Sequence, residues 1–158
     1  MDGERPLRSR ASLFNALVMF VNRTMRVVTI YWVDYDGYFK KLITLKPGDH
    51  RSTNTFSTHP WVFKDATTGE RMHVENSYVY WPKPLIYSDH EKLPRVKRRQ
   101  IEIHFPMRSL RESSLWIIAK NLQQDEDIKE LELPNTLSSD LAGIFIEYER
   151  YKRNSKYL

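Results

Sequence analysis

The stretch IEIHFPMRSLRE, residues 101–112, contains the change of pattern that decides the fold. Its first part alternates apolar and polar residues as far as Phe105, which predicts a strand with one buried face. After Pro106 comes the capping box Ser-Leu-Arg-Glu, in which Ser109 accepts from the backbone N–H of Glu112 and the Glu112 carboxylate returns to the cap. The stretch therefore predicts a last strand followed at once by a helix.

Upstream of this stretch lie short apolar runs separated by turn signals. The first run, 13–20, is interpreted as a strand rather than a signal peptide, and runs rich in β-branched and aromatic residues follow at 26–35, 42–45, 52–65 and 72–81. Such spacing, with Gly-containing and Pro-containing turns between the runs, is typical of an antiparallel sandwich or barrel. The polar segment 88–100 is expected to be a loop.

Downstream, two helices are predicted. In the first, apolar residues recur at four-residue spacing from Leu110, but others, such as Trp116, lie on further sides. The segment after residue 105 is too short to bury two apolar faces of this helix. We therefore expect the second face to contact another protein. Pro134 is expected to begin an amphipathic helix, because its missing N–H costs nothing there. The fold class is α+β: an N-terminal antiparallel β-sandwich, residues 1–105, followed by a small helical domain, residues 106–158.

Composition narrows the function. The 158 residues carry a net charge of +5 and include no cysteine, which excludes disulfides, thiolate metal sites and a cysteine nucleophile. Residues 1–105 hold 17 Lys and Arg against 11 Asp and Glu, which suggests either an acidic partner or an ordinary solvated surface. No apolar run approaches the roughly 18 residues of a membrane span, so no membrane partner is expected.

Catalysis is not predicted. The five histidines are scattered, and the sequence has no Gly-x-Ser-x-Gly, phosphate loop or dinucleotide fingerprint, so we expect no catalytic residue, no metal and no cofactor. The sequon at Asn22 is interpreted as chance. The basic cluster of Arg95 and 97–99 is either a solvated loop or a nuclear or nucleic-acid signal.

A set of polar residues beside a tryptophan is unusual for a strand. If residues 52–65 form one extended strand, then Thr55, Ser57 and His59 point to the same face as Trp61. An aromatic surface with a few aimed polar groups is typical of a small-ligand pocket. The other reading is a sheet face that is half exposed.

Four runs of the sequence, in the same order, resemble those of the von Hippel–Lindau tumour suppressor family, and in particular of its insect-type members. They are NRTMRVVTIYWVDYDG (22–37), TLKPG (44–48), FSTHPWVFKDATTGE (56–70) and IHFPMRSLRESSLW (103–116). The resemblance covers about residues 18 to 150. It implies a β-sandwich with a helical domain and a non-catalytic adaptor, the substrate receptor of a cullin-RING ubiquitin ligase. The implied ligand is the degron of hypoxia-inducible factor α, bound after a proline is 4-hydroxylated.

The resemblance also implies a hydroxyproline pocket. Its two tryptophans are walls, Thr55 and His59 are partners of the hydroxyl, and Asn54 contacts the peptide backbone. Thr55 stands where the family has a serine, and Leu42 stands where it has a tyrosine, for which Tyr35, Tyr38 or Phe39 are candidate substitutes. The implied peptide-binding residues are Trp32, Leu42, Asn54, Thr55, Phe56, His59 and Trp61.

In the helical half, residues 109–118 resemble the family's Elongin C box, with Ser114 in place of its cysteine. The implied Elongin C-binding residues are Ser109, Leu110, Ser113, Ser114, Leu115, Ile117 and Ile118. A cullin box is implied at Leu133, Pro134 and Leu137. The implied partners are Elongin C with Elongin B, a cullin scaffold with its RING protein, and hydroxylated hypoxia-inducible factor α, in the cytoplasm and nucleus.

Two alternatives remain from the residues alone. A basic, aromatic-rich β module could bind nucleic acid through aromatic side chains on an exposed strand face, with steep salt dependence. A scaffold protein could use only the helical face.

Overall fold

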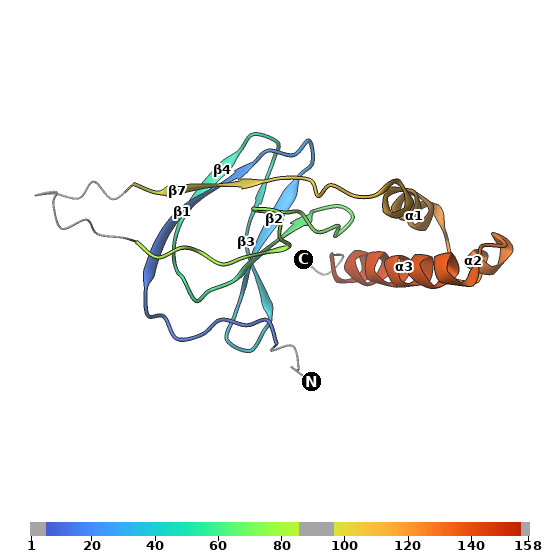
Figure 1. Ribbon diagram of the computed structural model, residues 1–158, viewed down its shortest axis with the longest axis horizontal. Helices are drawn as coiled ribbons and strands as arrows, with labels where there is room; N and C mark the ends of the chain where they lie inside the picture. The colour runs from blue at the N-terminus through green and yellow to red at the C-terminus, as the bar shows by residue number, and fades with distance from the viewer. Residues whose placement is uncertain (1–5, 86–96, 156–158) are drawn as a thin grey trace, which may run out of the picture. The chain divides into compact units, whose positions relative to one another are not determined.

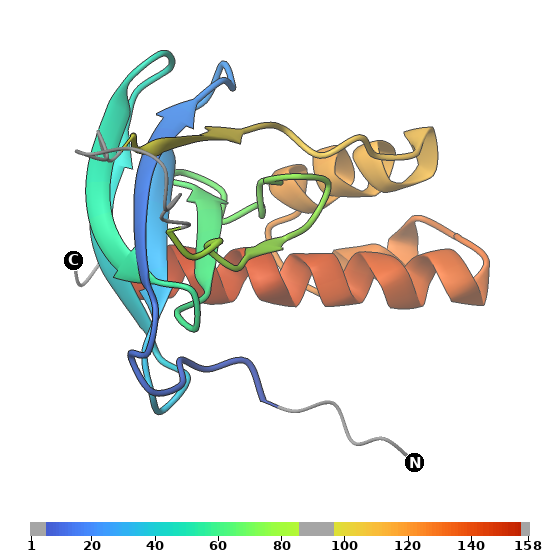
Figure 2. The same cartoon turned by 60° about the vertical axis from the view of Figure 1, so that its left-hand side comes forward.

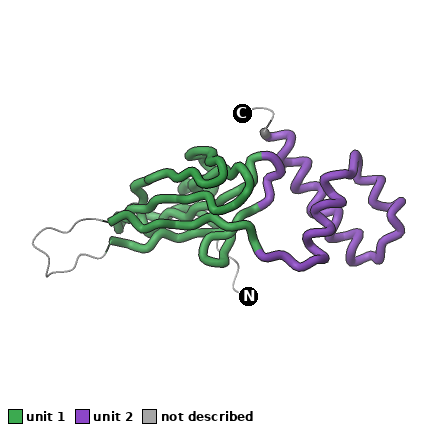
Figure 3. Tube along the Cα trace, turned by 90° about the horizontal axis from the view of Figure 1, so that it is seen from above, with its two compact units in different colours: residues 1–66, 71–106 green, residues 67–70, 107–158 purple. Residues whose placement is uncertain are grey.

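The computed structural model describes residues 6–85 and 97–155, which divide into two compact units (Figure 3). Unit 1 comprises the chain up to Ala66 together with Arg71–Pro106, and unit 2 comprises Thr67–Glu70 and the chain from Met107 onward. Most of the predicted loop 88–100, Arg95 included, lies outside the described residues. Its end does not form a loop, because Arg99 begins the last strand.

Unit 1 is a β-sandwich of two sheets, as the sequence predicts (Figures 1 and 2). In the first sheet β1 lies between β4, which it pairs antiparallel, and β7, which it pairs parallel. The second sheet has the order β3-β2-β5-β6, with antiparallel neighbours. The strands are β1 (Asn15–Asn22), β2 (Val28–Val33), β3 (Phe39–Leu45), β4 (His50–Phe56), β5 (Trp61–Asp65), β6 (Val79–Tyr80) and β7 (Arg99–Ile103).

The sandwich core follows from the alternation of apolar residues along the strands. In β1, Ala16, Val18 and Phe20 are buried because residues two apart point to the same face. The ring of Phe20 lies 5.2 Å from that of Trp61 and 5.4 Å from that of Phe63, centroid to centroid. One strand of the first sheet and one of the second thus contribute the central aromatic contacts.

The prediction of one strand over 52–65 is wrong. Two strands, β4 and β5, lie there in different sheets, joined by a turn over 57–60. The backbone N–H of His59 donates to the Phe56 carbonyl in this turn, and Pro60 has no N–H to give to a strand ladder. The run 72–81 is likewise broken, because Glu75 and Asn76 have φ of 50° and 61° and turn the chain before β6.

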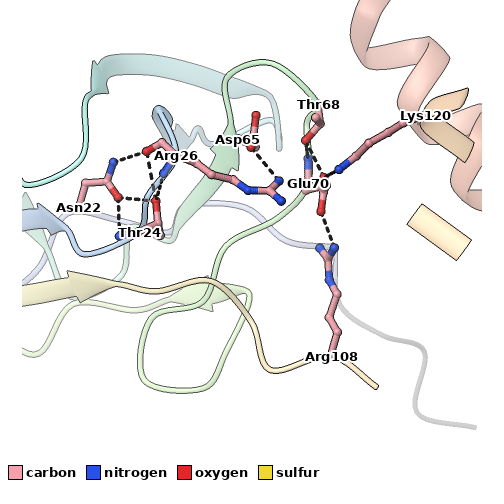
Figure 4. A network of polar contacts seen from close by, with 8 residues as sticks. All are labelled: Asn22, Thr24, Arg26, Asp65, Thr68, Glu70, Arg108 and Lys120. Carbon is pink, nitrogen blue, oxygen red and sulfur yellow. Dashed lines mark hydrogen bonds and ion pairs between the residues drawn. The ribbon is translucent and has the colours of Figure 1, made fainter. Parts of the chain in front are cut away.

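The turn between β1 and β2 is held by the side chain of Asn22, which is fully buried (Figure 4). Its Nδ2 donates to the carbonyls of Arg26 and Leu45, and its Oδ1 accepts from both the backbone and the hydroxyl of Thr24. An amide nitrogen committed in this way is not accessible in the folded chain. The sequon at Asn22 therefore has a structural role, in line with its interpretation as chance.

Unit 2 contains α1 (Leu110–Asn121), α2 (Asp127–Glu130) and α3 (Asn135–Ser155). The predicted cap is present, since the Ser109 hydroxyl accepts from the Glu112 N–H at 3.1 Å, although the Glu112 carboxylate lies 3.6 Å from Arg108 Nε. Pro134 lies directly before Asn135, the first residue of α3. Its carbonyl accepts a hydrogen bond from the backbone N–H of Leu137. The core of the unit consists of Leu115, Ala119, Ile128, Leu141 and Phe145.

The turn Thr67–Glu70 falls in unit 2, whereas the sequence analysis placed it with the sandwich. Its Glu70 carboxylate is 1% exposed and forms ion pairs with Arg108 and Lys120 (Figure 4). Both cations also lie over the ring of Trp116. A buried carboxylate needs such partners, and here they come from the helical part of the chain.

We expect Glu70→Gln to destabilise the protein by about 3–5 kcal/mol, because two cations would then face a site without its buried negative charge. Urea unfolding followed by circular dichroism measures the change. Glu75→Gln is the matched control, since Glu75 forms an exposed pair with Lys83 at 3.8 Å and should cost less than about 1 kcal/mol. Equal effects of the two changes would show that the buried charge is not stabilising.

Candidate functional site

A cavity of about 340 Å³ opens in unit 1. All seven residues that the sequence analysis assigned to a peptide pocket line it. Three further residues line it that sequence reasoning did not single out. The complete lining is Trp32, Lys40, Lys41, Leu42, Thr53, Asn54, Thr55, Phe56, His59 and Trp61.

The cavity residues come from both sheets. Trp32 on β2 lies opposite Trp61 on β5 in the ladder of the second sheet, and Leu42 comes from the neighbouring edge strand β3. Thr55 comes from β4, an edge strand of the first sheet, where it lies opposite the buried Ala16. The sequence argument from a single strand face is therefore wrong, although Thr55, His59 and Trp61 do line one cavity. Ser57, which that argument included, belongs to the turn and does not line the cavity.

Hydrogen bonds fix the orientation of both tryptophan walls. The indole N–H of Trp61 donates to Thr55 Oγ1 at 3.2 Å, and that of Trp32 donates to Ser9 Oγ at 2.7 Å. Ser9 in turn donates to the Val33 carbonyl. Because Thr55 Oγ1 is used as an acceptor by Trp61, its own O–H remains to be donated. Thr55 is 5% exposed, so its hydroxyl belongs to the interior of the cavity rather than to its rim.

The His59 ring packs against two aromatic rings, and its Nε2 lies within hydrogen-bond distance of two hydroxyls. Its ring stacks on Trp32, with centroids 5.3 Å apart and an interplanar angle of 28°, and lies 5.0 Å from the Phe56 ring. Its Nε2 lies 3.0 Å from Ser12 Oγ and 3.3 Å from Tyr35 Oη. Burial lowers the pKa of His59, and a hydrogen bond with the Arg10 backbone opposes this only in part. The imidazole is therefore neutral at pH 7.

Ser12 and Tyr35 are functional candidates that the sequence analysis missed as partners of His59. They lie 47 and 24 residues from it along the chain, and no local pattern links them. Tyr35 was a candidate to replace the tyrosine lost at Leu42, but its hydroxyl contacts His59 instead. Tyr38 and Phe39, the other candidates, are exposed and do not line the cavity.

The helical residues assigned to Elongin C do not all lie at the surface. Leu110 and Ile117 are 84% and 62% exposed, and Ser109 and Ser114 are exposed as well. Ser113 and Ile118 are half-buried, as are Leu133 and Leu137 of the expected cullin box, whose Pro134 is exposed. Leu115 is 5% exposed and packs in the core of unit 2, so its role there is structural.

A second hollow of about 540 Å³ lies between α1 and α3. Polar and charged side chains surround one apolar strip there. Its lining is Ser109, Arg111, Glu112, Leu115, Ser139, Asp140, Gly143, Ile144 and Glu147. Ser109 is the only exposed residue that this hollow shares with the predicted Elongin C set.

Residues 6–85 and 97–155 show neither a membrane-spanning helix nor a cluster of metal ligands. No helix in this part of the chain combines the length and the apolar character that crossing a membrane requires. The same residues hold no group of three or more His, Asp or Glu side chains placed to share a metal ion.

Comparison with known proteins decides the family. A family model described as the VHL beta domain matches residues 7–87. Protein Vhl of Drosophila melanogaster is 35% identical over 161 residues, which cover 96% of this chain and 90% of that protein. This chain belongs to the VHL family. Membership supports a general role in substrate recognition for a ubiquitin ligase, and members of the family are adaptors rather than enzymes.

The lowered pKa of His59 predicts a pH dependence of stability. Below about pH 6.5 the unfolded chain protonates this histidine while the folded chain resists, so the stability present above that pH is lost as pH falls towards the folded pKa. His59→Asn should remove this part of the loss between about pH 7 and 5. Thermal unfolding at several pH values measures it, with His50→Asn, an exposed substitution on β4, as control. Parallel pH profiles of wild type and His59→Asn would contradict the expectation.

Proposed function

We propose that this chain is the substrate-recognition subunit of a cullin-RING ubiquitin ligase and that its cavity binds a 4-hydroxyproline degron. The proposed substrate is hypoxia-inducible factor α, which is thereby directed to proteasomal degradation. The observation that carries the proposal is one cavity in which two anchored tryptophans lie beside a buried hydroxyl and a buried neutral imidazole.

The cavity suits a hydroxylated pyrrolidine ring. Trp32, Trp61 and Leu42 supply apolar walls for the ring carbons. Thr55 has a hydroxyl hydrogen to donate, and neutral His59 has nitrogens that accept or donate according to its tautomer. Unmodified proline would leave the Thr55 O–H without an acceptor, at about 1–3 kcal/mol for an unsatisfied buried group, whereas His59 Nε2 keeps the Ser12 and Tyr35 hydroxyls. Hydroxyproline would accept from Thr55, and this difference between the two ligands is the basis of discrimination.

The peptide on either side of the hydroxyproline has a surface to pair with. Strand β4 lies at the edge of its sheet in the order β4-β1-β7, so its outward backbone groups have no strand partner in the described sandwich. An extended peptide could add to this edge through main-chain hydrogen bonds. Asn54 is exposed on β4 at the mouth of the cavity, where its amide can bond to the peptide backbone.

Thr55→Val should reduce the preference for a hydroxyproline peptide over its proline twin by about tenfold, since it keeps the shape and removes one hydroxyl. Binding of the proline peptide should change less than that of the hydroxyproline peptide, although the Trp61 N–H loses its acceptor. Isothermal titration calorimetry with the paired peptides measures both affinities. Thr44→Val on the same sandwich is the control, because the Thr44 hydroxyl bonds to Thr29 and lies outside the cavity.

Equal affinity of the wild type for the two peptides would refute the hydroxyproline pocket. A wild-type preference that survives in Thr55→Val would instead remove Thr55 from the hydroxyl contact and leave His59 as its partner.

For the helical unit we propose contacts with Elongin C, together with Elongin B, on α1. We also propose a cullin with its RING protein near Pro134, and residence in cytoplasm and nucleus. Support comes from Leu110 and Ile117, large apolar side chains left exposed on a helix whose other side is already packed. Exposed apolar side chains of this kind mark protein interfaces.

Leu110→Asp should abolish co-purification with Elongin C, because it places a charge on the proposed apolar contact. Co-expression followed by size-exclusion chromatography measures the complex. Met25→Asp is the control, since Met25 is 92% exposed in unit 1 and its substitution should leave the complex intact. Retention of Elongin C by Leu110→Asp would show that α1 binds something else.

The nucleic-acid alternative gains no support from the two cavity tryptophans. Trp61 is buried and Trp32 is half-buried, and both indole N–H groups are bonded internally. Stacking of bases requires aromatic faces exposed on a strand.

A further inference from the structure

The hydroxyproline proposal leaves three lining residues of the cavity unexplained. Thr55, His59 and the tryptophans account for a ring with one hydroxyl, but Thr53, Lys40 and Lys41 also line the same cavity. Leu42, which lies beside Lys41 on β3, offers no polar group there. Polar recognition beyond the ring hydroxyl and the peptide backbone therefore depends on the threonine and the lysines.

Thr53 has a buried hydroxyl without a partner. It lies two residues from Thr55 on β4 and opposite Val18 of the core, so its side chain shares the inward face of the sheet. Its Oγ1 is buried and finds no hydrogen-bond partner among the described residues. Buried hydroxyls are nearly always bonded, and an unbonded one in a ligand cavity calls for a partner from the ligand.

The charge of the lining is one-sided. Two lysines and no carboxylate line the cavity. Lys40 lies 3.6 Å from the Asp34 carboxylate, which compensates part of its charge, whereas Lys41 forms no ion pair within the described residues. A cavity edge of this composition favours an anion.

We propose that Thr53 and Lys41 form a second polar subsite, which selects an acidic side chain close to the hydroxylated residue of the degron. The inference rests on the proposed function and deepens it. The Thr53 hydroxyl donates to a carboxylate oxygen of the ligand, and the Lys41 ammonium balances its charge. The ligand is thus recognised by two features, a ring hydroxyl at Thr55 and His59 and a carboxylate at Thr53 and Lys41.

The test uses the full chain and short synthetic peptides. Each has one central hydroxyproline in an otherwise neutral sequence, and a glutamate is moved through the flanking positions one at a time. Fluorescence anisotropy at two salt concentrations gives the affinities, and glutamine at the same position gives the neutral reference. We expect one or two positions to respond, with glutamate binding about five- to tenfold more tightly than glutamine and less so at high salt.

Variants assign the preference to residues. Lys41→Gln and Thr53→Val should each reduce the preference for glutamate severalfold while leaving the preference for hydroxyproline over proline intact. Thr53→Ser should retain both preferences. Lys46→Gln is the matched control, because it makes the same charge change on an exposed residue that directly follows β3 and does not line the cavity.

A second readout separates recognition from folding. Removing an unpaired buried hydroxyl relieves a desolvation cost, so Thr53→Val should not lower the Tm of the free protein. A hydroxyl with a structural role would lower the Tm when removed. A lowered Tm, or a glutamate preference that is absent in wild type or unchanged in both variants, overturns the subsite. If hydroxyproline is preferred all the same, the proposed function stands, whereas failure of all peptides to bind overturns both.

Discussion

The reversal of the chain over residues 57–60 is the constraint on which the cavity depends. It ends β4 in one sheet and begins β5 in the other, so Thr55 and Trp61 reach each other across the sandwich and bond at 3.2 Å. The same turn places His59 against Trp32, within reach of the Ser12 and Tyr35 hydroxyls. A continuous strand would have left these side chains in one row on a single sheet. The turn instead brings them to one cavity.

Both tryptophans and His59 are already bonded to other side chains of the protein. Each tryptophan N–H has an acceptor, and His59 Nε2 has two hydroxyls nearby. These bonds fix side chains in place before any ligand arrives, which reduces the entropy that binding must overcome. The Thr53 hydroxyl differs from these groups, because it is buried and has no partner in the described protein.

The two units carry surfaces of different chemistry. The sandwich offers an open cavity lined by aromatic rings, hydroxyls and lysines, a composition typical of a ligand pocket. The helical unit offers exposed Leu110 and Ile117, suited to a permanent apolar contact. An adaptor needs both, one contact that depends on the state of the substrate and one that does not. Members of the VHL family are substrate adaptors rather than enzymes.

The sequence by itself determined the fold class and the change of pattern at Pro106. Both the apolar–polar alternation of a strand and the capping box of a helix involve residues that are close together in the chain. It also named seven cavity residues, but through resemblance, since its own argument from a single strand was wrong. Only the tertiary structure decided where Ser12, Tyr35, Lys41 and Thr53 lie, and that Glu70 belongs with the helical unit. These placements join residues far apart in the chain through buried polar contacts and sheet registry. Local periodicity carries no information about either.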